Sequence, residues 1–363
     1  MSKRPINKIN REQPLLFDFI DESENETIDF RYIITSYGAD YPVDSLMKRI
    51  DDGVIFVPPF QRQFVWNVDE ASKFVESLIL GLPVPGIFLS KEKGTNKLLI
   101  VDGQQRLLTL YQFYQGYFDK LPFKLQNVQE DLNGKTYRTL KPSDRIRLDD
   151  SILHATIVRQ DEPDDNESSV YQIFERLNSG GRALKPQEIR ACIYYGEFNE
   201  LLNVLVKHQA WRQIFGKNSD YRLKEQELIL RFFSLLLYRN EYEKPLKSFL
   251  NMVMSRNRDC NEHSAEKLSE IFKKNFDFIV QFLNPRPFRI KRNLNLGAYD
   301  AISTGIAERL MKSNVQDYAA FQEAYTNLVE NEEFIQVVQG GTSDENNIRM
   351  RLDMAINAFV NIK

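Results

Sequence analysis

The sequence is poor in the residues on which several classes of protein depend. It contains two cysteines, Cys192 and Cys260, and three histidines, His154, His208 and His263. Two isolated cysteines cannot form a disulfide scaffold or a thiolate zinc site, and they favour a reducing compartment. The histidines are far apart in the sequence and have dissimilar neighbours. The pattern Asp/Glu-x-Lys, which ends a common nuclease signature, does not occur. We therefore recognise no metal-nuclease centre in this chain.

Long apolar runs and a strong net charge are also missing. One of the longest apolar runs, residues 232–238, is too short to span a bilayer, and the N-terminus lacks an apolar signal core. We expect a cytoplasmic protein that has no membrane segment. The net charge of −3 excludes a globally basic nucleic-acid-binding protein, so any contact with DNA must be local.

The pattern of the chain predicts an α+β protein with a sheet domain followed by an all-helical domain. Residues 1–31 form a polar N-terminal lead that includes a run of acidic residues. Residues 32–195 alternate short strands with amphipathic helices, as expected for a domain built around a sheet. Residues 196–363 carry only helical patterns.

The most informative stretch of the sheet domain is centred on Asp102. Residues 98–101 read as a buried strand, Asp102-Gly103 as a tight turn, and the residues from Gln104 as a helix that ends near Gly116. A glycine turn before a helix N-terminus is a natural anion site, and Arg106 adds a guanidinium suited to phosphate. The alternative is a capping box, in which Asp102 is the N-cap and Gln105 returns the hydrogen bond.

Two further segments place polar side chains next to turns. They are Gln61-Arg62 and the stretch from Arg176 to Gly181, which contains Asn178 and Gly180. Arginines can clamp phosphate oxygens, glycines such as Gly103, Gly180 and Gly181 permit close backbone approach, and Asp102 could hold Mg²⁺. If strands 54–57 and 98–101 are parallel neighbours, the loops that follow them emerge at the same edge. We then expect the three segments to line one pocket, although each could be only a turn or a cap.

A basic cluster in the helical half could contact DNA. It consists of Arg286, Arg289, Lys291 and Arg292. Such a cluster can bind a nucleic-acid backbone, but it is also typical of a solvated loop.

Three ordered motifs in residues 32–195 resemble the N-terminal domain family of GmrSD-type restriction endonucleases. They are residues 57–66 (VPPFQRQFVW), residues 101–107 (VDGQQRL) and residues 174–181 (FERLNSGG), the last followed by Glu188-Ile189-Arg190. The resemblance implies a ParB/sulfiredoxin-like sheet domain and nucleotide binding or hydrolysis at the Asp-Gly-Gln-Gln-Arg motif. It also implies a role in bacterial defence against phage, especially phage with modified DNA. Two-part members carry a C-terminal nuclease domain with a His-x-x-Pro element, which this chain lacks, so a separate nuclease subunit could supply cleavage.

The leading hypothesis is a nucleoside-triphosphate-dependent sensor or regulatory subunit of a DNA-restriction system. Arg62 and Arg106 would contact phosphates, Mg²⁺ would lie near Asp102, and Gln104 or Gln105 would orient the attacking water. Two rival hypotheses use the same residues. In one, the chain is a DNA-binding module that does not hydrolyse nucleotide; in the other, it is a structural interaction protein whose loops are only caps.

Overall fold

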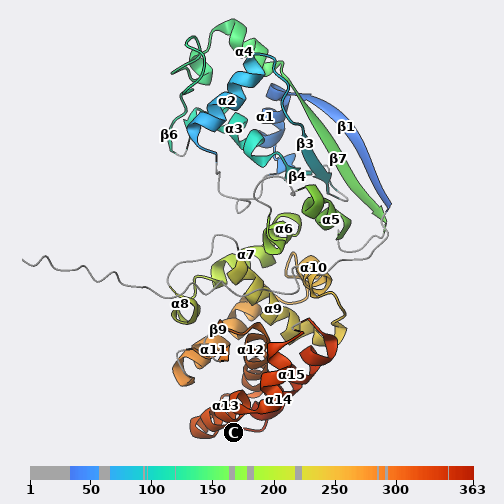
Figure 1. Cartoon of the computed structure of the whole chain (residues 1–363), viewed down its shortest axis with the longest axis vertical. Coiled ribbons are helices and arrows are strands. Elements are labelled where there is room, and N and C mark those ends of the chain that lie inside the picture. The colour runs from blue at the N-terminus through green and yellow to red at the C-terminus, as the bar shows by residue number, and fades with distance from the viewer. Residues whose placement is uncertain are drawn as a thin grey trace, which may run out of the picture. The chain divides into compact units, whose positions relative to one another are not determined.

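The computed structural model describes residues 33–56, 66–92, 95, 97–118, 120–162, 168–177, 184–216, 223–283, 286–290, 293–341 and 343–363 (Figure 1). These residues belong to two compact units. The sheet unit lies within residues 28–200 and 251–262, and the helical unit lies within residues 201–250 and 263–363. The predicted α+β class is confirmed, because a mixed sheet with helices precedes a helical C-terminal region.

The sheet unit is built on five strands in the order β1-β7-β3-β4-β2. Their bounds are β1 Ile33–Pro42, β2 Ile55–Phe56, β3 Ile87–Lys91, β4 Leu98–Asp102 and β7 Ile152–Glu162. β1 pairs with β7 and β3 pairs with β4 in antiparallel fashion, whereas β7 with β3 and β4 with β2 are parallel pairs. The sequence left open whether the strands near residues 54–57 and 98–101 are parallel neighbours, and the pairing of β2 with β4 shows that they are.

Helices cover the sheet and bury its alternating apolar residues. The helices of this unit are α1 Val43–Asp51, α2 Val68–Ile79, α3 Gln104–Gln115, α4 Pro142–Asp149, α5 Ser168–Leu177 and α6 Pro186–Ile193, and α7 Glu197–Leu205 begins here and continues into the helical unit. Leu98 and Ile100 of β4 lie in one core cluster with Val75 of α2 and Leu110 of α3. Burial of such side chains contributes about 25 cal/mol per Å² of apolar surface. The strand therefore holds the Asp102 turn on a rigid base.

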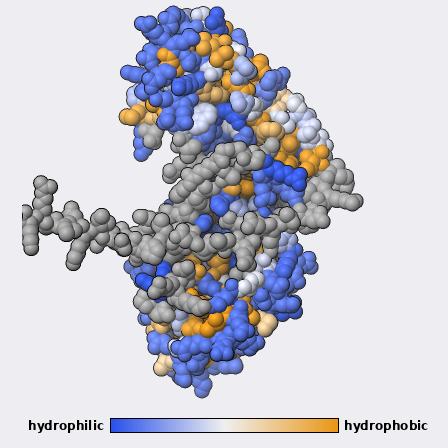
Figure 2. All heavy atoms as spheres, in the orientation of Figure 1, coloured by the Kyte–Doolittle hydropathy of each residue, from blue (hydrophilic) through white to orange (hydrophobic). Residues whose placement is uncertain are grey.

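Two short elements and one turn complete the sheet unit. Strands β5 Tyr117–Phe118 and β6 Leu121–Pro122 form a small antiparallel pair, and η2 spans Tyr137–Thr139. On the face drawn in Figure 2, hydrophilic residues surround scattered apolar ones. Among the described residues of this unit, the large apolar side chains exposed to solvent include Leu82, Tyr117, Leu121 and Ile146.

The helical unit packs around a buried central helix, α12. Its helices are α8 Gln209–Phe215, α9 Lys224–Tyr238, η3 Arg239–Glu241, α10 Leu246–Arg256 (which continues into the sheet unit), α11 Ala265–Phe282, α12 Leu296–Lys312, α13 Tyr318–Glu330, α14 Glu332–Gln339 and α15 Glu345–Phe359. The expectation that only helices follow residue 196 is wrong in one detail. Two-residue strands β8 Arg289–Ile290 and β9 Asn293–Leu294 pair in antiparallel fashion, because their backbones hydrogen-bond to each other and not within a helix. Among the described residues, no helix is both long and apolar enough to cross a membrane.

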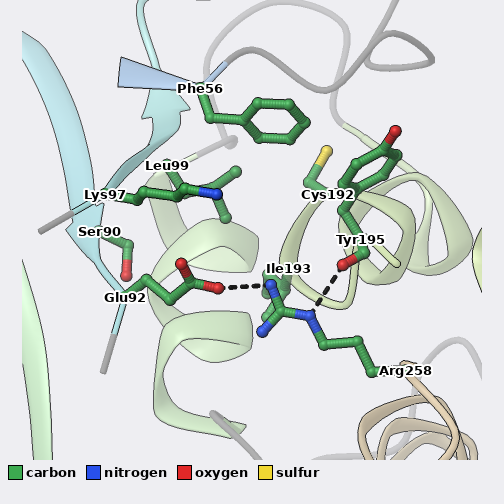
Figure 3. A pocket seen from close by; sticks show the side chains of 9 residues that line it. All are labelled: Phe56, Ser90, Glu92, Lys97, Leu99, Cys192, Ile193, Tyr195 and Arg258. Atoms are coloured by element: carbon green, nitrogen blue, oxygen red, sulfur yellow. Dashed lines mark hydrogen bonds and ion pairs between the residues drawn. The ribbon is translucent and has the colours of Figure 1, made fainter. Parts of the chain in front are cut away.

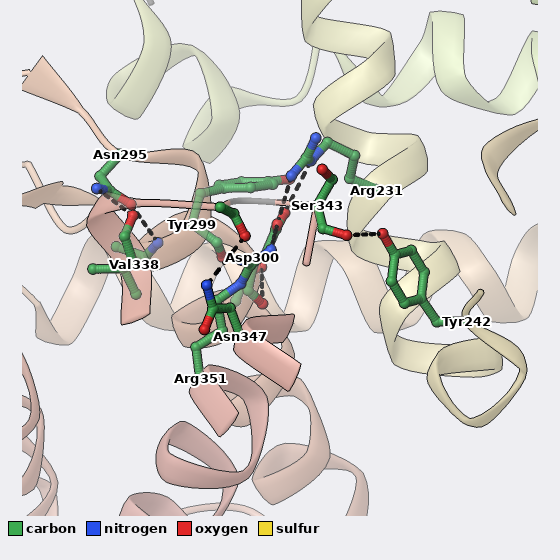
Figure 4. Close-up of polar contacts among 12 residues, drawn as sticks. Arg231, Tyr242, Asn295, Tyr299, Asp300, Val338, Ser343, Asn347 and Arg351 are labelled. Atoms are coloured by element: carbon green, nitrogen blue, oxygen red, sulfur yellow. Dashed lines mark hydrogen bonds and ion pairs between the residues drawn. The ribbon is translucent and has the colours of Figure 1, made fainter. Parts of the chain in front are cut away.

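A charged cluster lies inside the helical unit (Figure 4). Asp300 of α12 accepts hydrogen bonds from Arg231 of α9, at 3.1 and 2.6 Å, and from Arg351 of α15, at 2.8 Å. All three side chains are buried. These contacts join two guanidinium groups to one carboxylate and tie three helices together.

Candidate functional site

The Asp102 turn lies where two parallel strands end. Ile55 and Phe56 of β2 pair with Leu98 and Leu99 of β4, so both strands run toward the same edge of the sheet. Asp102 is the last residue of β4, and α3 begins two residues later. Ligand sites commonly form at such an edge, because the following loops converge there.

Gly103 makes the turn possible. Its φ of +90° is in the left-handed region, and a Cβ built on it would lie 2.5 Å from Cγ2 of Ile87. A side chain here would therefore meet both a conformational and a steric barrier. Gly103 is also the N-cap of α3, which begins without a hydrogen bond from a capping side chain. The capping-box alternative for Asp102 and Gln105 is wrong, because each of these side chains bonds elsewhere.

Arg106 is held by two hydrogen bonds. Its Nη2 donates to Oδ2 of Asp102 at 2.7 Å, and its Nη1 donates to the carbonyl oxygen of Gly86 at 2.6 Å. The Arg106 side chain is only 12% exposed, whereas that of Asp102 is 39% exposed. The guanidinium therefore braces the turn against the start of β3 and orients a carboxylate that stays accessible.

Gln105 connects the first turn of α3 to an aromatic residue. Its Oε1 accepts a hydrogen bond from the backbone N–H of Trp66 at 3.3 Å. The Trp66 ring packs edge-on to Phe74 of α2, with ring centroids 5.6 Å apart. Gln105 thus positions the chain just before α2.

These residues surround one cavity, which we call the motif pocket. It has a volume of about 380 Å³ and is lined by Trp66, Phe74, Pro85, Val101, Asp102, Gly103, Gln104, Gln105, Arg106 and Leu184. Asp102, Gln104 and the helix start supply its polar groups (called the polar end below), and the aromatic and aliphatic side chains supply its apolar surface. All four residues that we expected to be catalytic therefore lie around a single pocket.

Several other predicted site residues lie outside the described residues. They are Gln61, Arg62, Asn178, Gly180 and Gly181 of the phosphate-binding set, and Lys291 and Arg292 of the basic cluster. Trp66 is the first described residue after the segment that contains Gln61-Arg62, and Leu184 is the first after the segment that ends at Gly181. Both residues line the motif pocket. Arg176 lies exposed in the last turn of α5.

Two members of the basic cluster are described. Arg286 is exposed, and Arg289 is half-buried in β8. Burial and the nearby charge of Arg286 lower the pKa of Arg289. The two cations are therefore close enough to disfavour each other.

The histidines occupy structural positions. His154 of β7 pairs with Asp40 of β1 across the sheet, with Nδ1 and Oδ1 2.5 Å apart. His208 contacts Asp277 at 2.8 Å, and the His263 ring lies beside Tyr238. Within the described ranges, no three His, Cys, Asp or Glu side chains gather as a metal site.

A second, smaller pocket lies at the sheet face opposite the Leu98 core (Figure 3). Its volume is about 110 Å³, and it is lined by Phe56, Ser90, Glu92, Lys97, Leu99, Cys192, Ile193, Tyr195 and Arg258. The Cys192 thiol donates to the carbonyl of Glu188 at 3.0 Å. Neither the Glu92–Arg258 contact nor the Trp66–Phe74 pair was predicted, since no local sequence signal marks contacts between distant residues.

The geometry defines an α+β domain with a pocket at the end of two parallel strands. Residues 43–195 match the family described as GmrSD restriction endonuclease, N-terminal domain. The match covers less than half of the chain and supports the resemblance noted in the sequence for these residues. That family is described as part of a restriction endonuclease. A comparison of the whole chain with curated proteins gives no match.

Proposed function

We propose that the chain is a nucleoside-triphosphate-binding and -hydrolysing sensor or regulatory subunit of a restriction system. One observation carries the proposal. The motif pocket combines the accessible Asp102 carboxylate with the start of α3, within the residues that match the GmrSD family. A structural interaction protein needs no cavity at this point, whereas a phosphate-binding enzyme does.

The N-terminus of α3 is the phosphate-binding element in this proposal. Helix N-termini attract anions through their N–H groups and the helix dipole, and α3 begins without a side-chain cap. Arg106 acts mainly by holding Asp102 and the Gly86 carbonyl. Arg62, Arg176, Asn178, Gly180 and Gly181 keep their predicted role as further phosphate contacts.

The donor set at the polar end fits a magnesium ion that arrives with the ligand. Mg²⁺ commonly binds proteins through one or two carboxylates together with substrate phosphates. Asp102 supplies one accessible carboxylate, and the bound ion would neutralise charge on the phosphates. Gln104 and Gln105 both line the pocket and keep their predicted role, in which one of the two amides orients the attacking water.

DNA is the expected macromolecular partner, and cleavage is assigned to a separate nuclease subunit. The family match concerns a restriction endonuclease domain. The sequence offers no nuclease motif in this chain, so nucleotide turnover would license cutting by the partner. Modified phage DNA fits the defence role that the resemblance implies.

Calorimetry with the full chain tests the proposal. ATP, GTP, CTP and UTP are titrated with and without Mg²⁺, and phosphate release is measured. Asp102→Asn should lower turnover by about a hundredfold or more, because a charge-neutralising group is lost. The control is Asp131→Asn, since Asp131 is an exposed acid of the same unit that contacts only Lys141 among its described ion pairs. Absence of nucleotide binding under both conditions would overturn the proposal.

The second candidate function is DNA binding without hydrolysis. The position of the basic cluster favours it, because Arg286 is exposed and Arg289 lies nearby in β8, where a DNA phosphate would contact both. Affinity should then fall steeply with salt, and Arg286→Ala with Arg289→Ala should reduce that salt dependence. Unchanged DNA affinity in the double variant would exclude this cluster.

A further inference from the structure

We infer that the apolar side of the motif pocket binds a nucleobase, which stacks on the ring of Trp66. This inference rests on the proposed nucleotide-binding function and adds the part of the ligand that the polar end does not address. It assigns a role to Trp66, Phe74 and Gln105 that their sequence motifs do not show.

The lining of the pocket combines two kinds of chemistry. Asp102 and Gln104 are polar, whereas Trp66, Phe74 and Leu184 present aromatic and aliphatic surface. Phe74 and Val101 are buried, but Trp66 is only half-buried. An inorganic phosphate would fill the polar end and leave the apolar walls bare. A nucleotide carries both a charged group and a flat aromatic ring, so it matches both sides.

The orientation of Trp66 suits stacking. Its ring makes an edge-type contact with Phe74 at an interplanar angle of 66°. In such a pair, the partner ring does not cover both faces of the indole. An indole face at the wall of a pocket is a platform for any base, since every base has a π-face.

Gln105 fastens this platform to the phosphate-binding element. Its side-chain oxygen accepts a hydrogen bond from the backbone N–H of Trp66, at 3.3 Å, from the first turn of α3. The backbone that carries the Trp66 ring is therefore tied to the helix start before any ligand binds. Such preorganisation lowers the entropy lost on binding. Gln105 is a positioning residue in this arrangement.

The chemistry of the walls also bears on base selectivity. Among the described lining residues, the aromatic side offers indole, phenyl, proline and leucine surface and no charged side chain. Stacking without edge recognition is tolerant of base identity. The four common ribonucleoside triphosphates should thus bind within roughly tenfold of one another, with purines tighter because they stack over more area.

The chain has two tryptophans, which allows a direct optical test. Trp211 is fully buried in the helical unit, so Trp211→Phe leaves Trp66 as the single reporter. In this full-length variant, ATP should quench the Trp66 fluorescence. Inorganic tripolyphosphate should bind by calorimetry with little change in fluorescence, since it has no base.

Two substitutions in the otherwise natural chain complete the test. Trp66→Leu should weaken ATP binding by about tenfold or more while leaving tripolyphosphate affinity unchanged, and Trp66→Phe should restore most of the loss. Thermal melts identify any variant that fails to fold. ATP binding that neither quenches Trp66 nor weakens in Trp66→Leu overturns the stacking inference and leaves nucleotide binding standing. Failure of both ATP and tripolyphosphate to bind overturns the proposed function as well.

Discussion

Nη2 of Arg258 donates a hydrogen bond to Oε1 of Glu92 at 2.5 Å, although 166 residues separate them (Figure 3). Nε of Arg258 also donates to the carbonyl oxygen of Tyr195 at 2.8 Å. A Cβ on Gly196 would lie 2.4 Å from the Arg258 carbonyl oxygen, so the two backbones are in close contact. Residues 251–262 are therefore part of the sheet unit. A fragment that stops near residue 195 would lack this support.

The first prediction concerns Arg258. Arg258→Ala should lower the stability of the sheet unit by about 1–3 kcal/mol, because a charge-assisted hydrogen bond and a carbonyl contact are lost in a partly buried setting. Hydrogen exchange of β3 and α6 in the full chain measures the effect. Arg256→Ala is the matched control, since its ion pair with Glu262 is longer, at 3.9 Å, and Glu262 is more exposed than Glu92. If the two variants lose the same stability, the Arg258 contacts do not hold residues 251–262 to the sheet unit in the way we infer.

The same contact predicts a dependence on acid. Burial alone would raise the pKa of Glu92, but hydrogen bonds from Thr95 and Arg258 outweigh it and lower the pKa below its ordinary 4.5. A depressed carboxyl pKa stabilises the folded state above pH 4.5, and this contribution is lost as the pH falls through the folded value. Melting temperatures between pH 7 and pH 3 should therefore fall less steeply in Glu92→Gln than in the natural chain.

The second prediction compares two glycines with similar backbones. Gly103 and Gly116 flank α3 with φ of +90° and +86°, but only Gly103 lies against another side chain, that of Ile87. Gly116→Ala should cost about 1–2 kcal/mol for the left-handed conformation alone. Gly103→Ala should cost more and should also reduce ligand binding in the motif pocket. Equal melting temperatures would show that the turn relaxes around the added methyl group.

Local sequence signals predicted the elements of the motif correctly. The apolar run at residues 98–101, the Asp102-Gly103 turn and the helix from Gln104 all depend on neighbours in the chain, and the structure has each of them. The parallel pairing of β2 with β4 could only be stated as a condition. Strand order depends on contacts between residues far apart in sequence.

The hydrogen-bond partner of Asp102 could not be predicted from its neighbours in the sequence. An N-cap and an ion pair to the residue four positions on are both compatible with the sequence Asp-Gly-Gln-Gln-Arg. The carbonyl of Gly86 decides between them, because it accepts from Arg106 and turns the guanidinium toward Asp102. Likewise, nothing near Trp66 in the sequence marks its bond to Gln105, 39 residues away.

The third prediction concerns a tyrosine pair that holds α3 against α4. Tyr114 and Tyr137 stack with ring centroids 4.1 Å apart, and both hydroxyls donate to Asp149, that of Tyr114 at 2.5 Å. Burial, followed by the hydrogen bond to Asp149 and its charge, raises the pKa of Tyr114 above its ordinary 10.0.

A raised tyrosine pKa stabilises the folded state below pH 10.0, and this contribution is lost as the pH rises toward the folded value. Tyr114→Phe should thus cost about 1–2 kcal/mol at neutral pH and flatten the loss of stability above pH 10.0. Urea unfolding at several alkaline pH values measures both effects. Tyr117→Phe is the control, because that side chain is 62% exposed. If stability falls equally steeply with alkaline pH in Tyr114→Phe and in the natural chain, ionisation of Tyr114 does not cause that loss of stability.

The last prediction concerns the unequal charges around Asp300 (Figure 4). One buried carboxylate bonds to two buried guanidinium groups, and Nε and Nη1 of Arg351 have no hydrogen-bond partner among the described residues. Burial lowers the pKa of Arg351, which means that its charge is costly there. Asp300→Asn removes the charged acceptor that two buried guanidinium groups share, so it should destabilise the helical unit by about 3–5 kcal/mol.

Arg351→Met should cost much less, because it removes the surplus cation and leaves the Arg231–Asp300 pair in place. For the same reason, adding Arg351→Met to Asp300→Asn should restore part of the lost stability. Hydrogen exchange of α12 and thermal unfolding of the four proteins form a double-mutant cycle that isolates the coupling. If Arg351→Met proves as destabilising as Asp300→Asn, packing of the long side chain, and not charge balance, sets the stability of this cluster.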